Sequence, residues 1–180
     1  MKRENSRSPK PLALRSGDVA VALALALNPG QPYAGLAHAL GISLGESHNA
    51  VGRLIAARLV SQDSRAVSGS RLAEFLKSGV PYAFPAELGA ETRGVPTAYG
   101  APPLALDPSG SGVPVWPSAL GAARGPAVIP LYPGAPALLV TNHALYELLT
   151  LVDAVRIGRA RDRERATGEL RHRLLTQPVA

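Results

Sequence analysis

Apolar residues recur at helical spacing in two parts of the chain, and a long irregular stretch separates these parts. In the first part, the spacing predicts helices over residues 16–27, 33–40, 44–58 and 71–77. Asn28-Pro29-Gly30-Gln31-Pro32 breaks the chain between the first two. The sequence therefore begins as a cluster of short helices.

The second and third predicted helices are joined by a tight turn. Gly41 can adopt the positive φ that ends a helix. Ser43 can cap the next helix, and Glu46 completes an S-x-x-E capping box. Ser16 is expected to cap the first helix in the same way. Two helices joined by such a tight turn form a helix-turn-helix, which places its second helix in the DNA major groove.

The third helix is amphipathic, with an apolar side and a small, polar side. The side chains expected to face inward are Leu44, Ser47, Val51, Leu54 and Ile55. Those expected to face outward are Gly45, Glu46, His48, Asn49, Gly52 and Arg53.

After this helix, residues 59–68 predict a short β-hairpin with Arg65 close to its tip. A hairpin at this position is the wing of a winged-helix domain. We therefore expect a mainly α fold. Residues 1–15 are expected to be a disordered basic arm, and 16–78 a winged helix-turn-helix domain.

Residues 79–140 change the composition sharply. They hold twelve of the 17 prolines and nine of the 18 glycines, but only five charged residues. Such a proline density excludes regular helices and central strands. Large apolar side chains such as Trp116 and Tyr132 nevertheless favour burial. We predict a Pro/Gly-rich extended wrap, laid over the helical body or over a partner.

The last part of the chain is helical again. A stripe of leucines and valines predicts a helix over 142–155. The arginine-rich stretch 156–173 is interpreted as its solvated continuation, with Gly168 as the weak point. Residues 141–176 are therefore expected to form a C-terminal helical region for dimerisation or partner contact.

The positive charge is concentrated in the first half. Residues 1–77 hold ten Lys/Arg against five Asp/Glu, and residues 78–180 hold nine against eight. A basic excess on the helix-turn-helix segment favours polyanion binding, because phosphate neutralisation releases counterions. General arginine and alanine usage is the alternative explanation.

Residues 16–77 resemble the winged-helix domain of MarR-type regulators, most clearly in LAHALGISLGESHNAVGRLIAARLV. The chain is also similar to uncharacterised bacterial winged-helix proteins through GVPYAFPAELGAETRGVPTAYGAPPL and ALYELLTLVDAVRIGRARDRE. The MarR resemblance implies a homodimer that binds an operator in duplex DNA. The chain departs from that family in residues 79–140, which separate the DNA-binding helices from the terminal helices that usually form the dimer.

The candidate DNA contacts follow from this reading. Asn49 can pair bidentately with adenine and Arg53 with guanine, while glycines allow the backbone to approach DNA. Arg65 can contact phosphate or the minor groove; the alternative for each residue is an ordinary surface side chain. The full set is Ser43, Gly45, His48, Asn49, Gly52, Arg53 and Arg65.

Other functions have weaker support. No Walker, G-x-G-x-x-G or G-x-S-x-G element is present, so we expect no enzyme and no cofactor. The four histidines lack metal-ligand spacing, so no metal site is expected. The absence of cysteine and of a long apolar run indicates a cytoplasmic protein without membrane contact. The alternative function is an antitoxin-like module that binds a protein partner through 79–140, with secondary autoregulatory DNA binding.

Overall fold

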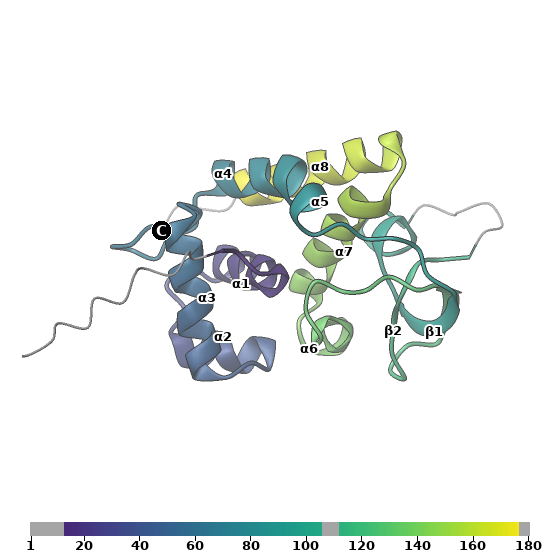
Figure 1. The fold of residues 1–180 in the computed structure, drawn as a ribbon, viewed down its shortest axis with the longest axis horizontal. Helices are drawn as coiled ribbons and strands as arrows, with labels where there is room; N and C mark the ends of the chain where they lie inside the picture. Colours follow the sequence, from purple (N-terminus) through teal and green to yellow (C-terminus); the bar gives the residue numbers. More distant parts are fainter. Residues whose placement is uncertain (1–12, 106–111, 177–180) are drawn as a thin grey trace, which may run out of the picture.

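The computed structural model describes residues 13–105 and 112–176, which form a mainly helical structure with one small sheet (Figure 1). Most of the basic arm predicted for residues 1–15 lies outside this range. No helix within the described ranges combines the length and the hydropathy required to cross a membrane.

The first three helices are α1 (Ser16–Leu27), α2 (Tyr33–Leu40) and α3 (Leu44–Ala56), close to the predicted ranges. Every residue of α1 from 18 to 25 is buried, because this helix lies between α3 and α7 (Figure 1). An all-round apolar helix is stable only in such a central position. The predicted order of these helices is therefore confirmed.

The turn between α2 and α3 has the predicted geometry. Gly41 lies at φ 63°, in the left-handed region that favours glycine. The Ser43 hydroxyl accepts a hydrogen bond from the Glu46 backbone N–H at 3.1 Å. In the predicted capping box the Glu46 carboxylate would accept from the Ser43 backbone N–H. It pairs with Arg53 instead. Ser16 does not cap α1, because Arg15 is the cap residue and its N–H donates to Asp18 at 2.8 Å.

The segment after α3 contains the predicted hairpin in minimal form. Val60 and Val67 make a single antiparallel bridge, and the Ser61 N–H donates to the Ala66 carbonyl at 2.8 Å. Arg65 lies at φ 55° in the turn. The fourth helix is longer than predicted: α4 (Gly69–Glu74) continues through a π-helical turn, Phe75–Gly79, into α5 (Val80–Ala83).

Residues 79–140 contain a sheet, so the prediction that they hold no central strand was wrong. The strands β1 (Glu91–Pro96), β2 (Val115–Pro117) and β3 (Ala123–Pro126) form an antiparallel sheet in the order β2-β1-β3. Each strand ends on a proline. The prolines therefore interrupt few ladder hydrogen bonds, which is why the sheet tolerates them.

Side-chain hydrogen bonds connect the sheet to α7 (His143–Ile157). The short helix α6 (Leu138–Thr141) precedes α7. The buried Asp153 carboxylate accepts from Trp116 Nε1 at 2.6 Å and from Thr97 Oγ1 at 2.9 Å. Its other oxygen pairs with Arg156 at 2.6 Å, and Arg156 also donates to the Phe84 carbonyl at 2.8 Å. Residues of segment 79–140 are thus hydrogen-bonded to a helix of their own chain.

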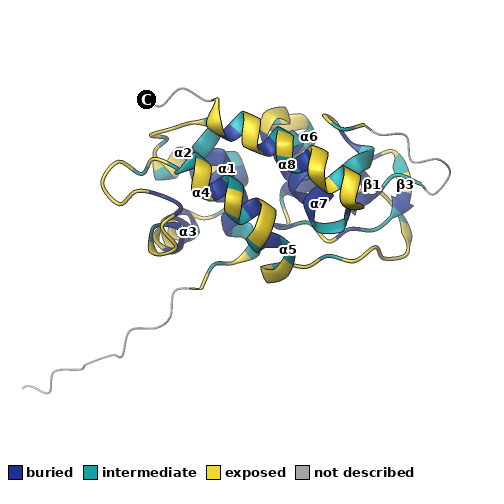
Figure 2. Ribbon diagram, turned by 90° about the horizontal axis from the view of Figure 1, so that it is seen from above, coloured by how far each residue is buried: buried dark blue, intermediate teal, exposed yellow. Residues whose placement is uncertain are grey.

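The last helix, α8 (Ala160–Leu175), is separate from α7, so the predicted continuous helix was wrong. The break falls at Gly158, and Gly168 lies inside α8. Ala166, Leu170 and Leu174 form its buried stripe, and α8 packs against both α7 and α4 (Figure 2). The apolar stripe of α8 is therefore covered within the chain.

Candidate nucleic-acid interface

The outer face of α3 is open to solvent along most of the helix. Gly45, His48, Asn49 and Gly52 are all exposed, and they recur at the spacing of one helix face. The opposite face is formed by buried residues, namely Ser47, Ala50, Val51 and Leu54. The structure therefore brings together four of the seven predicted contact residues. Ser43, at the start of the helix, is exposed as well.

Two orientations on α3 were predicted incorrectly. Leu44 was expected inward but is 52% exposed, because the first turn of α3 projects beyond the core. Arg53 was expected outward but is only 6% exposed. A guanidinium in that position is not available to a guanine. The prediction that Arg53 contacts a base is therefore wrong for this structure.

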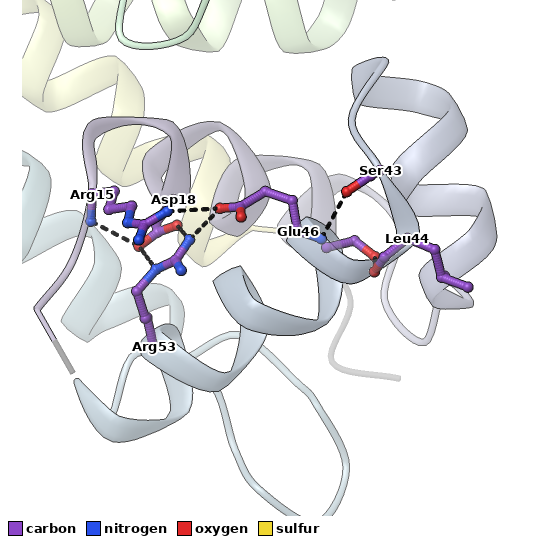
Figure 3. Close-up of polar contacts among 7 residues, drawn as sticks. Arg15, Asp18, Ser43, Leu44, Glu46 and Arg53 are labelled. Carbon is purple, nitrogen blue, oxygen red and sulfur yellow. Dashed lines mark hydrogen bonds and ion pairs between the residues drawn. The ribbon is translucent and has the colours of Figure 1, made fainter. Parts of the chain in front are cut away.

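Arg53 is held by two carboxylates from different helices (Figure 3). Its Nε donates to Asp18 Oδ2 at 2.8 Å, and its Nη2 donates to Asp18 Oδ1 at 2.7 Å. Nη2 also donates to Glu46 Oε1 at 2.6 Å. The hydrogen bond to Asp18 and the neighbouring charges raise the pKa of the guanidinium above its ordinary value, despite the opposing effect of burial. This cluster fixes the last turns of α3 against the beginning of α1.

A stack of three side chains joins the hairpin, the start of α2 and the outer face of α3. The rings of Tyr33 and His48 are stacked, with centroids 3.7 Å apart. The Arg65 guanidinium carbon lies 4.7 Å from the centroid of the Tyr33 ring, and its Nη1 donates to the Gln31 carbonyl at 3.3 Å. His48 and Arg65, two predicted site residues, are therefore brought together by Tyr33.

Sequence reasoning missed Tyr33 and Asp18 as parts of this site. Tyr33 is the first residue of α2, and nothing in local spacing connects it to His48. Asp18 is a lone acid in an apolar helix, a signal that it has a buried partner. Its place in the first turn of α1, at the positive end of the helix dipole, offers a simpler local explanation for this acid.

Two further arginines lie near the end of α3. A hollow between this end and the hairpin is lined by Ile55, Arg58, Val67 and Arg71, among others. Arg71 Nη1 donates to the Arg58 carbonyl at 3.2 Å, and both side chains are exposed. They add positive charge beside the outer face of α3.

The excess of Lys and Arg over Asp and Glu is smaller in residues 13–77, which the structure describes, than in residues 1–77 of the sequence. Residues 13–77 hold six Lys/Arg against four Asp/Glu, because four of the basic residues lie within 1–12. Arg53 is also neutralised by its carboxylate partners. The cations of the candidate interface are therefore Arg58, Arg65 and Arg71.

The histidines show one pairing that sequence reasoning overlooked. His143 Nδ1 lies 3.5 Å from Glu147 Oε1, four residues along α7. Glu147 is also 2.6 Å from Arg173, so this carboxylate already has a cationic partner. Within residues 13–105 and 112–176, no cluster of three His, Asp or Glu side chains is suited to a metal ion.

No protein-family model matches this chain, and no match is found among curated proteins or solved structures.

Proposed function

We propose that the protein is a sequence-specific duplex-DNA-binding transcriptional regulator. The observation that carries this proposal is the open outer face of α3, bearing His48 and Asn49 beside the hairpin. The order of helices, the tight turn at Gly41 and the hairpin at 59–68 support a winged helix-turn-helix reading of residues 16–78.

The residues of this face have chemistry that suits base recognition. Asn49 offers a donor and an acceptor that match adenine in the major groove. His48 offers ring nitrogens for the same groove, and its stacking on Tyr33 limits the orientation of the ring. Gly45 and Gly52 carry no side chain, so the α3 backbone can approach the base edges closely.

The surroundings of α3 supply phosphate contacts. The exposed Ser43 hydroxyl and the Arg65, Arg58 and Arg71 guanidinium groups flank the recognition face. Phosphate contacts fix the position of a protein on DNA without reading sequence. In this proposal Arg65 remains a phosphate or minor-groove contact, held in place by Tyr33.

A homodimer is part of the proposal, because one short helix reads only a few base pairs and two half-sites raise the affinity. The dimer contact differs from the MarR type, since the apolar stripe of α8 is buried against α4 and α7. Light scattering after size-exclusion chromatography would measure the mass with and without duplex DNA.

The test of the proposal is selection of binding sites from a random duplex pool. We expect enrichment of a defined sequence. The variant His48→Ala/Asn49→Ala is expected to lose about 1–3 kcal/mol for that sequence and little for a scrambled duplex. His38→Ala, an exposed histidine on α2, is the matched control. Enrichment of no sequence, or equal affinity of the double variant, would overturn the proposal.

A second candidate is a protein-binding, antitoxin-like module, and exposed apolar residues on segment 79–140 favour it. Tyr82 is 86% exposed and Ile129 is 71% exposed. Leu88 is 49% exposed, and the next residue, Gly89, donates its N–H to the Ala127 carbonyl at 2.8 Å. A polypeptide that co-purifies with the native protein, but not with Ile129→Asp, would support this alternative.

A further inference from the structure

The outer face of α8 carries an unusual concentration of positive charge. The side of α8 opposite its buried stripe is exposed (Figure 2) and has one acidic residue beside three arginines. Helical spacing places the following residues on this face: Arg161, Glu164, Arg165, Gly168, Arg171, His172 and Leu175.

The three arginines of this face differ from the other arginines of α8 in their contacts. Arg163 donates to the Gly158 carbonyl at 3.0 Å, and Arg173 pairs with Glu169 and Glu147. In the described part of the chain, Arg161, Arg165 and Arg171 have neither a hydrogen-bond acceptor nor a carboxylate partner. Their charges are available to a ligand.

Helix stability explains only some of these charges. Cations at the end of a helix interact favourably with its dipole, which accounts for Arg171. Arg161 lies in the first turn of α8, where a cation opposes the positive end of the dipole. Arg161 therefore costs some helix stability, as expected if this face of α8 serves to bind an anion.

The C-terminal end of α8 reaches the base of the hairpin. A side chain at Gly69 would collide with the carbonyl oxygen of Leu174, so α4 begins directly against the last turn of α8. Arg71 follows within the first turn of α4 and contacts the Arg58 carbonyl at the end of α3. Arg71 and Arg58 therefore lie between the C-terminal end of α8 and the end of α3.

We propose that the outer face of α8 binds the phosphate backbone of the duplex that α3 reads. This inference rests on the proposed function and extends its contact surface. The partner is double-stranded nucleic acid, recognised by charge and not by base identity. The face adds affinity and salt dependence to binding, and leaves the sequence preference to α3.

The test compares two double variants that each remove two positive charges. Arg161→Gln/Arg165→Gln alters the α8 face, and glutamine preserves helix propensity. Arg93→Gln/Arg124→Gln is the matched control on the sheet, where these two arginines lie opposite each other in β1 and β3. Fluorescence anisotropy measures the affinity for the selected duplex and a scrambled duplex between about 50 and 200 mM salt, the range over which phosphate contacts dominate.

For the α8 variant we expect the slope of log K against log salt to fall by about 2, since each phosphate contact contributes about 0.9. Both duplexes should lose affinity by the same factor. The control variant should keep the wild-type slope. An unchanged slope for the α8 variant overturns the inference, as does an equal reduction of slope in the control variant.

The same measurements separate this inference from the proposed function. If His48→Ala/Asn49→Ala removes the sequence preference while the α8 variant keeps the wild-type slope, only the α8 inference fails. If no sequence is preferred but duplex binding still depends on Arg161 and Arg165, the α3 proposal fails and the α8 inference holds. If the protein binds no duplex, both fail.

Discussion

Arg53 and Asp18, 35 positions apart in the sequence, form a bidentate ion pair in the interior of the protein. The pair connects the first turn of α1 to the last turns of α3 (Figure 3). Because a bidentate geometry fixes both distance and orientation, it determines how α3 presents His48 and Asn49. Arg53 therefore acts on the candidate interface as a positioning residue.

The first prediction concerns the stability provided by this pair. Arg53→Ala leaves the Asp18 carboxylate buried without its partner, which should lower the free energy of unfolding by about 3–5 kcal/mol. Denaturant titration followed by circular dichroism would measure it. Arg165→Ala, at an exposed position of α8, is the control and should change stability by about 0.5 kcal/mol or less.

A second variant distinguishes the ion pair from a DNA contact. Asp18→Leu/Arg53→Met replaces both charges with apolar side chains and should recover most of the lost stability. The folded double variant should then bind the selected duplex within a few fold of wild type. A large specific loss of affinity at full folding would show that Arg53 contacts DNA after all.

The second prediction uses two exposed helical glycines as a matched pair. An added Cβ at Gly52 or at Gly168 would meet no atom within 4 Å. Alanine at either position should raise the free energy of unfolding by about 0.5–1 kcal/mol, because alanine has the higher helix propensity. Only Gly52→Ala should weaken the preference for the selected duplex over a scrambled one, since its methyl group lies on the outer face of α3. Loss of that preference in both variants would argue against a specific role for this face.

The third prediction is a loss of stability in alkali. Burial raises the pKa of Tyr132 to about 12, and burial together with the charge of Glu147 raises that of Tyr146 to about 12. Between about pH 10 and 12 the folded state therefore holds more protons than the unfolded state. Stability should fall as pH rises through this window, by up to about 1.4 kcal/mol per pH unit for each tyrosine.

The phenol of Tyr146 also donates to the Pro96 carbonyl at 2.8 Å, which requires the proton. Unfolding titrations at several pH values should show a smaller alkaline slope for Tyr146→Phe. Tyr82→Phe, at a position 86% exposed, should keep the wild-type slope. Equal slopes for wild type and Tyr146→Phe would contradict the assignment.

The fourth prediction concerns the anchor of segment 79–140. Asp153→Ala removes the acceptor for Trp116 and Thr97 and leaves the Arg156 guanidinium without its carboxylate. We expect a loss of about 3–5 kcal/mol in unfolding free energy. The fluorescence of Trp116, the single tryptophan, should shift to longer wavelength as its surroundings loosen. Glu164→Ala, on the exposed face of α8, should change neither quantity measurably.

The parts of the fold that the sequence predicted depend on local interactions. The ranges of α1, α2 and α3 follow from apolar spacing, and the turn at Gly41 follows from a backbone angle that glycine tolerates. The small, polar outer face of α3 could be recognised for the same reason, since helix periodicity alone separates its two sides.

The missed features depend on partners far apart in the sequence. The burial of Arg53 requires Asp18, and the orientation of His48 requires Tyr33. The sheet was missed because its prolines fall at strand ends, a detail that composition does not reveal. In α8 the stripe of Ala166, Leu170 and Leu174 was hidden among arginines, so a packed helix was interpreted as a solvated one.

The close contact between Gly69 and Leu174 also limits how this protein can be divided. A shortened polypeptide ending at residue 79 would uncover the side of α4 on which α8 rests, and water would reach apolar residues that are now fully enclosed. The amino-terminal helices are therefore not an interchangeable module that could be transferred alone to another protein. Any transplant would have to carry α7 and α8 with them.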